Sequence, residues 1–444
     1  MGIRKLYPMS PLEKMVDVYD SMRVPVKKAD RKPGPYPYYG ASGIADYVDS
    51  YIFDGEYLLL AEDGENLKTR NTPIAFLASG KFWVNNHAHI LQANSSSETR
   101  FLCYALQIAD VNSYLSGSTR PKLTQGDMRR IPVFAPKKSI KKAIAHVLGS
   151  LDDRIELNRR MNETLESMAQ TLFKSWFVDF DPVIDNALAS GKEIPEELSE
   201  KAQAHAALGD KRRPLPDEIC TLFPDEFTYS DELGWVPLGW EVKSIDEILK
   251  TVSETYPLKN VEKVVFLNTG DILDGHFLHQ KYSDTSSLPG QAKKSIMKDD
   301  ILYSEIRPKN RRFAYVYFDS PEYVVSTKLM VLRAKSNIKS VFSYYILKQQ
   351  TCIDYLQMMA ESRSGTFPQI TFDVLSTIKV ALPHKHTIIE YFLDNLLERL
   401  FQKTVENNNN SKCLSTLRDT LLPKLLSGEL RIPDAEKMVE ELAL

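Results

Sequence analysis

The sequence is poor in cysteine, and its cysteines are not arranged to form a metal site or a disulfide framework. The four cysteines, at positions 103, 220, 352 and 413, lie far apart, and no C-x-x-C pair occurs among the 444 residues. Zinc sites and small disulfide-bonded domains depend on closely spaced pairs. This cysteine usage is typical of a reducing environment, and we expect a cytoplasmic protein without a structural metal.

Long apolar runs and an excess of charge of one sign are also missing. No segment is an uncharged apolar stretch long enough to cross a bilayer, and the opening MGIRKLYPMS lacks the apolar centre of a signal peptide. We therefore expect no membrane contact. The net charge is only −3, so a nucleic acid would have to be bound by a local cluster of basic groups.

Motifs for catalysis are absent as well. The chain has no G-x-x-x-x-G-K-[ST] loop, no glycine-rich cofactor fingerprint and no Asp/Asn-Pro-Pro-aromatic motif of the kind used by amino-methylating enzymes. Asp299, Asp300 and Glu305 could be nuclease carboxylates, but no lysine follows Glu305 at the spacing that a metal-dependent nuclease uses. We expect a protein with no catalytic residues and no cofactor.

What the sequence does contain is a long internal repeat. Residues 117–136 read GSTRPKLTQGDMRRIPVFAP and residues 364–383 read SGTFPQITFDVLSTIKVALP, with threonine, proline and apolar residues in the same order. With 43% apolar and 26% charged residues, the chain has material for about two or three cores. The repeat therefore indicates two related domains in one chain.

Each copy of the repeat is followed by a heptad pattern of apolar residues. In the first copy the pattern predicts a helix of about 38 residues that ends near Phe177 and is roughly 57 Å long. The second pattern repeats the first 249 positions later, in the matched pairs Ile140 and Ile389, Leu165 and Leu414, and Leu172 and Leu421.

Polar residues interrupt both patterns at matched positions. Arg154 and Asn158 stand in the first where Lys403 and Asn407 stand in the second. A polar residue in a coiled-coil seam lowers stability but fixes register and partner, so we expect the helices to pack antiparallel, with Asn158 and Asn407 near the middle of the contact. The alternative is two ordinary amphipathic helices, each lying on its own domain. The seam of this coiled-coil spacer is predicted to include Leu151, Asn158, Leu165, Leu400, Asn407 and Leu414.

The segments that precede the two helices also resemble each other. GEYLLLAED (55–63) matches DDILYSEIR (299–307), and FWVNNHAHIL (82–91) matches YVVSTKLMVL (323–332), each an apolar strand that becomes polar at its end. Short helical patterns accompany these strands, so each segment is expected to be an α/β domain. Similar apolar cores with different polar ends indicate one scaffold that recognises two different ligands.

The predicted order is domain, helix, domain, helix, with the two domains at opposite ends of a stiff bar. Residues 181–234 are rich in proline, alanine and charge, and we expect a loosely structured connection with a short helix at 195–207. The predicted parts are a first domain at 1–136, a central helix at 137–180, the connection at 181–234, a second domain at 235–383, a C-terminal helix at 384–428 and a tail at 429–444.

Basic residues gather after a predicted strand of the second domain. Pro308 and Asn310 place them in a loop, and guanidinium groups match phosphate oxygens or guanine O6 and N7. A charge run is usually solvated surface, but here we expect DNA contact because serine, threonine and lysine end the neighbouring strand. The expected DNA-binding residues of this domain are Arg307, Lys309, Arg311, Arg312, Ser326, Thr327, Lys328 and Arg363.

The first domain offers a different polar set. Asparagine can pair with adenine edges and arginine with guanine, so these residues are chemically suited to reading bases. His87 and His89 could alternatively be metal ligands, but no third ligand is spaced to help them. The expected DNA-binding residues of this domain are Tyr38, Ser42, Lys68, Arg70, Asn71, Asn86, His87, Arg120 and Lys122.

Several stretches resemble one family across nearly the whole chain. GSTRPKLTQGDMRRIPVFAP runs into IAHVLGSLDDRIELNRRMNETLESMAQTLFKSWFVDFDPV, and LFPDEF, LGWVPLGWEV and LRDTLLPKLLSGEL follow later. Together they are similar to the specificity subunit of a Type I restriction-modification system. The usual apolar-Trp opening of a recognition domain precedes the second domain as GWVPLGWEV but is missing before the first, so we expect the first domain to lack an edge segment.

The resemblance implies two target recognition domains, each reading one half of a split, asymmetric double-stranded DNA sequence. It implies docking of two methyltransferase subunits and, through them, of the restriction subunits, while the chain itself is not an enzyme. Phe173, Trp176 and Phe177 would be free to meet partner helices unless they are buried in the domain. The alternatives are a specificity subunit whose partner fuses methyltransferase and nuclease, and a structural scaffold that does not read DNA.

Overall fold

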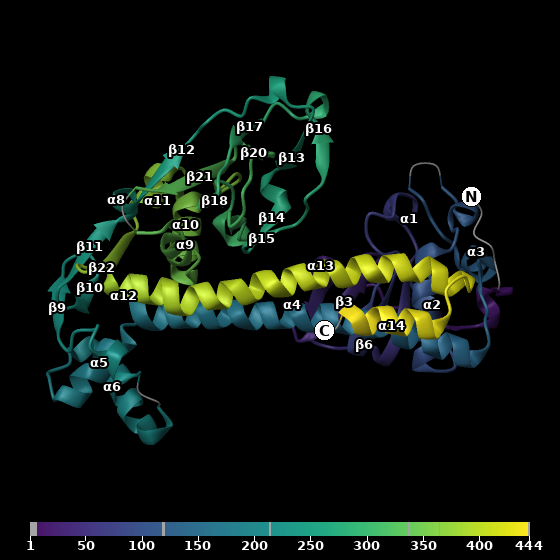
Figure 1. Ribbon diagram of the computed structural model, residues 1–444, viewed down its shortest axis with the longest axis horizontal. Helices are drawn as coiled ribbons and strands as arrows, with labels where there is room; N and C mark the ends of the chain where they lie inside the picture. The colour runs from purple at the N-terminus through teal and green to yellow at the C-terminus, as the bar shows by residue number, and fades with distance from the viewer. Residues whose placement is uncertain (1–6, 118–119, 213–214, 336–337, 364, 443–444) are drawn as a thin grey trace. The chain divides into compact units, whose positions relative to one another are not determined.

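The computed structural model describes residues 7–117, 120–212, 215–335, 338–363 and 365–442 (Figure 1). The chain divides into two compact units. Unit 1 comprises Met1–Asn162 together with Val405–Leu444, and unit 2 comprises Glu163–Thr404. The division falls inside both long helical segments, so each unit contains one globular part and a portion of each helix.

Unit 1 is built on a six-stranded sheet whose central strand is buried on both faces. In β5 (Phe53–Ala61), Leu58 and Leu60 face one core with helix α2 (Ser96–Ile108), while Leu59 faces a second core with Phe82. This explains why the strand reads as an unbroken apolar run. The sheet order is β2 (Asp17–Val18), β7 (Ala88–Gln92), β5, β6 (Ala75–Val84), β3 (Tyr36–Gly40) and β4 (Gly43–Val48).

Unit 2 places the same kind of strand between two cores. In β18 (Ile301–Ser304), Ile301 and Tyr303 belong to the core shared with the helices, and Leu302 belongs to another core. One sheet has the order β12 (Leu249–Val252), β21 (Leu329–Ala334), β18 and β19 (Phe313–Tyr315). The other has the order β16 (Tyr282–Asp284), β13 (Lys263–Leu267), β20 (Tyr323–Ser326) and β17 (Ala292–Ser295).

The α/β fold class is confirmed, but two of the expected strands are wrong in detail. The stretch 82–91 was expected to be one strand, and it is the end of β6, a turn and β7. The stretch 323–332 is likewise β20, a turn and β21, which belong to different sheets. In each stretch the polar residues between the two apolar runs mark the turn. Because the strands on both sides are buried, the alternation of apolar and polar residues does not reveal where one strand ends and the next begins.

The two long helical segments are also confirmed. Helix α4 (Lys138–Phe177) has 40 residues. The second segment runs through α12 (Thr387–Tyr391), a π-helical turn (Phe392–Leu397) and α13 (Glu398–Ser427). A π turn inserts one extra residue into the backbone ladder, which the heptad pattern did not predict.

Within unit 1 the two helices pack antiparallel, as predicted (Figure 1). Asp152 bonds Arg418 at 2.7 Å and Asn158 Nδ2 donates to Ser411 Oγ at 3.2 Å, so partner numbers fall along α13 as they rise along α4. Asn407 is 5% exposed and donates to Asn162 Oδ1 at 2.8 Å. Of the predicted seam residues, Leu151 and Leu414 are buried here, while Leu165 and Leu400 are half-buried in unit 2.

The aromatic residues at the end of α4 are not free to meet partner helices. Phe173, Trp176 and Phe177 are at most 6% exposed, and all three pack around Phe392 of the π turn in unit 2. Of the two alternatives, burial in the domain is therefore confirmed, because these large side chains fill the core between the helices and the second sheet.

Two further expectations are wrong. The described residues of the connection are not loosely structured but form α5 (Asp181–Ser190), α6 (Glu196–Leu208), which confirms the predicted short helix, α7 (Asp217–Cys220) and the hairpin of β9 (Phe227–Ser230) and β10 (Gly234–Pro237). The first domain has its own edge strand, β1 (Met9–Pro11), paired with β8 (Pro132–Phe134). In the tail, α14 (Ile432–Leu442) packs on unit 1 through the fully buried Ala435.

The amide pair in the helix seam leads to a test. Asn162→Ala and Asn407→Ala should each destabilise the protein, and a double-mutant cycle in urea should give a coupling of about 0.5–1.5 kcal/mol, because the two side chains share one largely buried hydrogen bond. Asn410, which is exposed on α13, serves as the control. A coupling between Asn162 and Asn410 equal to that between Asn162 and Asn407 would contradict the assignment.

Candidate nucleic-acid interface

In unit 1, three loops meet at the residue that follows β5. The Glu62 N–H donates to His87 O at 2.9 Å, and Glu62 O accepts from Leu123 N at 2.7 Å. Two residues on, Gly64 N donates to Pro121 O at 3.0 Å. The end of the strand is thus tied both to the β6–β7 turn and to the first copy of the sequence repeat.

Unit 2 has the same junction at the residue that follows β18. The Glu305 N–H donates to Lys328 O at 3.0 Å, and Glu305 O accepts from Ile370 N at 2.9 Å. Arg307 N donates to Pro368 O at 3.1 Å. In each unit a β-bridge joins the same two segments, Asp63 with Lys122 in unit 1 and Ile306 with Gln369 in unit 2. The repeat in the sequence is therefore the loop that closes on this strand end.

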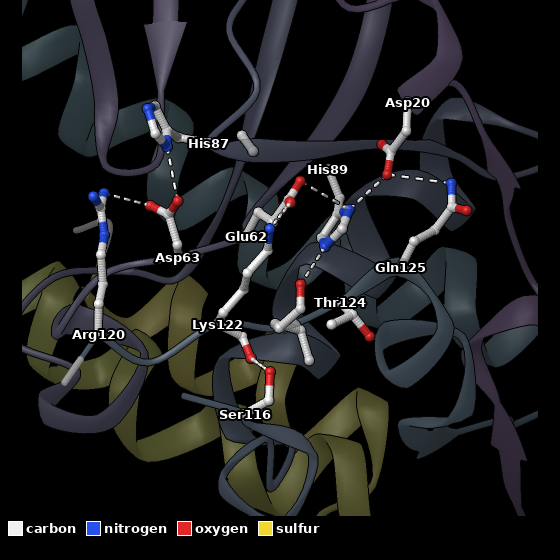
Figure 2. Close-up of polar contacts among 12 residues, drawn as sticks. Asp20, Glu62, Asp63, His87, His89, Ser116, Arg120, Lys122, Thr124 and Gln125 are labelled. Carbon is white, nitrogen blue, oxygen red and sulfur yellow. Dashed lines mark hydrogen bonds and ion pairs between the residues drawn. The ribbon is translucent and has the colours of Figure 1, made fainter. Parts of the chain in front are cut away.

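Each junction neutralises its glutamate with a lysine from a different segment. In unit 1, Lys122 of the repeat loop lies 3.3 Å from the Glu62 carboxylate (Figure 2). In unit 2, Lys328 of the strand turn lies 3.3 Å from Glu305 and also donates to Gln369 at 3.3 Å. The carboxylates thus hold cations in place at the junction instead of presenting free negative charge.

A buried ion-pair network adjoins the junction of unit 1, with Asp20 and His89 beside Glu62 (Figure 2). His89 Nδ1 lies 2.6 Å from Asp20, and its Nε2 lies 2.8 Å from Leu123 O in the repeat loop. Arg23 bonds Glu62 at 2.6 Å and lies 3.5 Å from Asp20. Sequence reasoning missed this role because Asp20 lies 69 positions from His89.

Asp20, Glu62 and His89 have the residue types of a metal site, and their ligand atoms lie within 4.8 Å of one another. The local contacts fit an ion-pair network better. Arg23 and Lys122 neutralise the two carboxylates, and His89 uses both ring nitrogens on protein acceptors. A divalent cation would have to displace these partners.

The Asp20 carboxyl is held in its ionised form. Burial alone raises its pKa, but hydrogen bonding and charge attraction from His89, the Ile90 N–H and the charge of Arg23 together lower the pKa below the usual value. Its two oxygens also accept from Ile90 N at 2.9 Å and Gln125 at 3.3 Å. The ionised carboxylate therefore links the sheet to the helix that follows the repeat loop.

The structure brings four of the predicted residues of the first domain together at its junction. Arg120 is 65% exposed at its side chain and bonds Asp63 at 2.7 Å, while His87 Nδ1 lies 2.8 Å from the same carboxylate. Lys122 lies beside them on Glu62, and Asn86 is exposed in the β6–β7 turn. These side chains form one polar surface.

The other predicted residues of the first domain lie elsewhere. Tyr38 is 1% exposed with its hydroxyl at Val26, so it does not belong to the polar surface. Arg70 donates to Gln107 O and Ala109 O at 2.6 and 2.5 Å, which gives it a bracing role at the end of α1 (Asn66–Thr69). Lys68, Asn71 and Ser42 are exposed outside the junction.

In the second domain, the basic loop is a short helical turn, η9 (Pro308–Asn310). Arg307 and Arg311, on either side of it, both have left-handed backbones, with φ of 44° and 52°. Arg307 and Lys309 are exposed. Arg311 bonds Asp274 and Gln350, each at 3.0 Å, and Arg312 donates to Gly270 O and Ile272 O at 3.0 and 2.8 Å. These last two arginines brace the loop.

The remaining predicted residues of the second domain divide in the same way. Ser326 is fully buried, and its Oγ accepts from Lys328 N at 3.2 Å, so it does not belong to the polar surface. Thr327 is half-buried, and Arg363 is exposed at the end of α10 (Gln350–Arg363). The polar surface of this unit consists of Arg307, Lys309, Thr327, Lys328 and Arg363.

Sequence reasoning also missed Phe367, which is 71% exposed in the second repeat loop. The signal was present, because SGTFPQIT aligned with GSTRPKLT places Phe367 at the position of Arg120. Glu62 and Glu305 were missed because the sequence does not reveal that their backbone groups bind two loops each.

No helix of the described residues is both long enough and apolar enough to span a bilayer.

Comparisons with known proteins agree on one family. The sequence model described as "Type I restriction modification DNA specificity domain" matches residues 7–167 and 237–409, which is more than half of the chain. The HindI specificity subunit of Haemophilus influenzae is 47% identical over 149 residues, 33% of this chain and 32% of that protein. The MjaIX specificity subunit of Methanocaldococcus jannaschii is 24% identical over 428 residues, 90% of this chain and 88% of that protein.

A comparison with solved structures found matches at low identity. The crystal structure of a Type I restriction-modification S subunit from M. genitalium is 16% identical, with a TM-score of 0.48, and the alignment covers 96% of this chain and 97% of that chain. The alignment with the HindI subunit, by contrast, spans about a third of that protein's length.

The lowered pKa of Asp20 predicts how acid affects the junction. Asp20→Asn should cost about 1.5–3 kcal/mol of unfolding free energy at neutral pH, because a hydrogen-bonded charged group is lost. A depressed carboxyl pKa stabilises the fold above the unfolded value of about 3.9, and this stabilisation is lost as the pH falls through the folded value. The difference between wild type and variant, measured by urea unfolding, should therefore shrink below about pH 4.

Asp17→Asn, at an exposed position on the neighbouring strand β2, is the matched control and should change stability little at any pH. A difference for Asp20→Asn that stays constant down to strongly acidic pH would show that the carboxylate charge does not stabilise the network.

Proposed function

The chain belongs to the family of Type I restriction-modification DNA specificity subunits, and from this membership we propose that it is the sequence-reading subunit of such a system. The observation that supports the proposal most is the paired junction. Each unit ties a strand end to a repeat loop by the same backbone hydrogen bonds and surrounds the loop with different polar side chains. One scaffold with two chemistries suits a protein that reads two unequal half-sites of double-stranded DNA.

Each junction would contact one half-site. In the first domain, Arg120, Lys122, Asn86 and His87 offer a guanidinium, an ammonium, an amide and an imidazole, which suit phosphate oxygens and base edges. In the second domain, Arg307, Lys309, Lys328 and Arg363 offer a more basic surface. The proposed target recognition domains are residues 1–136 and 235–383.

The helices would set the gap between half-sites and dock the methyltransferase subunits. The proposed spacer segments are 137–180 and 384–428. On α4, Leu157 and Met161 are 58% and 36% exposed one turn apart. Apolar side chains at this spacing suit an added partner helix. Two methyltransferase subunits, and restriction subunits bound through them, would supply the catalysis in a cytoplasmic complex.

Genomic methylation tests the proposed function. Profiling methylated adenine in cells with the gene present and deleted should reveal one asymmetric motif of two parts separated by a fixed gap, which disappears on deletion. An unchanged methylation pattern in cells that express the partner subunits, together with DNA binding that has no sequence preference, would favour a structural scaffold.

The basic loop of the second domain should contribute phosphate contacts. In the complex with methyltransferase subunits, Arg307→Gln together with Lys309→Gln should weaken binding to all DNA sequences and reduce the slope of log K against log salt by about 0.9 for each lost contact. Lys250→Gln, an exposed lysine on β12, is the control and should leave the slope unchanged. Equal slopes for the loop variant and the control would count against DNA contact by this loop.

A further inference from the structure

We propose that Phe367 is a specificity-determining residue that contacts the C5 methyl group of a thymine in the half-site of unit 2. The inference rests on the proposed DNA-reading function and extends it to one side chain and one chemical group. Phe367 has the highest exposed fraction among the large apolar residues of the described chain, at 71%.

The first argument is the fixed position of the backbone on both sides of Phe367. Arg307 N donates to the carbonyl of Pro368 at 3.1 Å, and Arg307 Nη2 lies 3.4 Å from the carbonyl of Thr366. Ile370 N donates to Glu305 O at 2.9 Å, and Gln369 forms a β-bridge with Ile306. A loop anchored this closely presents its side chain at little cost in conformational entropy.

The second argument is the equivalence with Arg120 in unit 1. There Gly64 N donates to Pro121 O at 3.0 Å, Leu123 N donates to Glu62 O at 2.7 Å, and Lys122 forms the bridge with Asp63. Arg120 therefore stands before the anchored proline of its loop as Phe367 stands before Pro368. Two loops with the same backbone bonds present a cation in one unit and an aromatic ring in the other.

The third argument is the charge around Phe367. Arg307, Lys309 and Arg363 are exposed on the segments that adjoin the loop, and Lys328 is held at the junction by Glu305. The segments next to this loop thus carry cations suited to phosphate oxygens, while Phe367 itself is apolar. This combination suits a DNA-binding surface on which basic side chains hold the DNA phosphates and an apolar side chain recognises one base.

The equivalence of Phe367 with Arg120 also indicates which apolar group of the DNA Phe367 contacts. An arginine fork reads guanine through O6 and N7 in the major groove. A side chain at the equivalent position of the second unit faces the same groove, where the thymine methyl group is the apolar feature of the base edges. An apolar wedge between base steps belongs to binding from the minor groove and does not follow from this arrangement.

The test uses the complex of the chain with its methyltransferase partners and the two-part motif obtained by methylation profiling. Each thymine in the half-site read by unit 2 is replaced in turn by uracil, which lacks only the methyl group. At one position this should weaken binding by wild type about threefold to tenfold. The same replacement should not change binding by Phe367→Ala, and Phe367→Leu should retain part of the sensitivity.

Tyr229→Ala is the matched control, since Tyr229 is 61% exposed on β9, outside the junction. It should retain full sensitivity to uracil. The thermal midpoint of each variant complex confirms that it is folded. Phe367→Arg should change the preferred base at one position of this half-site and leave the other half-site unaltered.

Two outcomes separate the failure of this inference from failure of the proposed function. A wild-type complex that reads a two-part motif but is insensitive to uracil at every position, or a Phe367→Ala complex as sensitive as wild type, overturns the thymine contact alone. A wild-type complex that recognises no motif overturns the DNA-reading function on which the inference rests.

Discussion

The arrangement of the two junctions depends on the backbone hydrogen bonds of one residue after a central strand in each unit. Glu62 and Glu305 each donate to a strand turn and accept from a repeat loop, so three segments that are distant in sequence meet at one peptide unit. Backbone bonds of this kind do not depend on the side chains of the loops they join. The loops can therefore differ in chemistry while their positions remain fixed.

The helices combine a buried apolar contact with a polar one. In unit 1, Leu151 and Leu414 are buried, and the same seam contains a hydrogen bond between the side-chain amides of Asn162 and Asn407. Amides stabilise the pair less than leucines would, but they accept only one register. In unit 2 the end of α4 relies on aromatic packing around Phe392. The contacts of α4 are thus fixed by a polar hydrogen bond in unit 1 and by the burial of large aromatic side chains in unit 2.

The sequence allowed the helices, the α/β class and the doubled loop to be predicted, because heptads and repeats are periodic signals. It did not reveal which segments are buried on both faces. The sequence therefore left open whether Phe173, Trp176 and Phe177 are buried, and in each domain two consecutive strands were predicted as one. The basic cluster was predicted, but its division into two roles was not. Arg311 and Arg312 are half-buried and bond acceptors from distant segments, while Arg307 and Lys309 are exposed. Tertiary contacts alone decide which basic residues hold the loop in place and which remain exposed.

Unit 1 is assembled from the two ends of the chain, since Leu414, Leu421 and Ala435 belong to the same core as Leu58 and Phe101. A ribosome delivers the N-terminal part of that core first and its C-terminal part last. Unit 2 is continuous in sequence and has all its residues as soon as Thr404 has emerged. During synthesis, unit 2 can therefore complete its core before unit 1. A chain truncated near its C-terminus would lack the helical residues that cover the core of unit 1, while unit 2 would keep all of its residues.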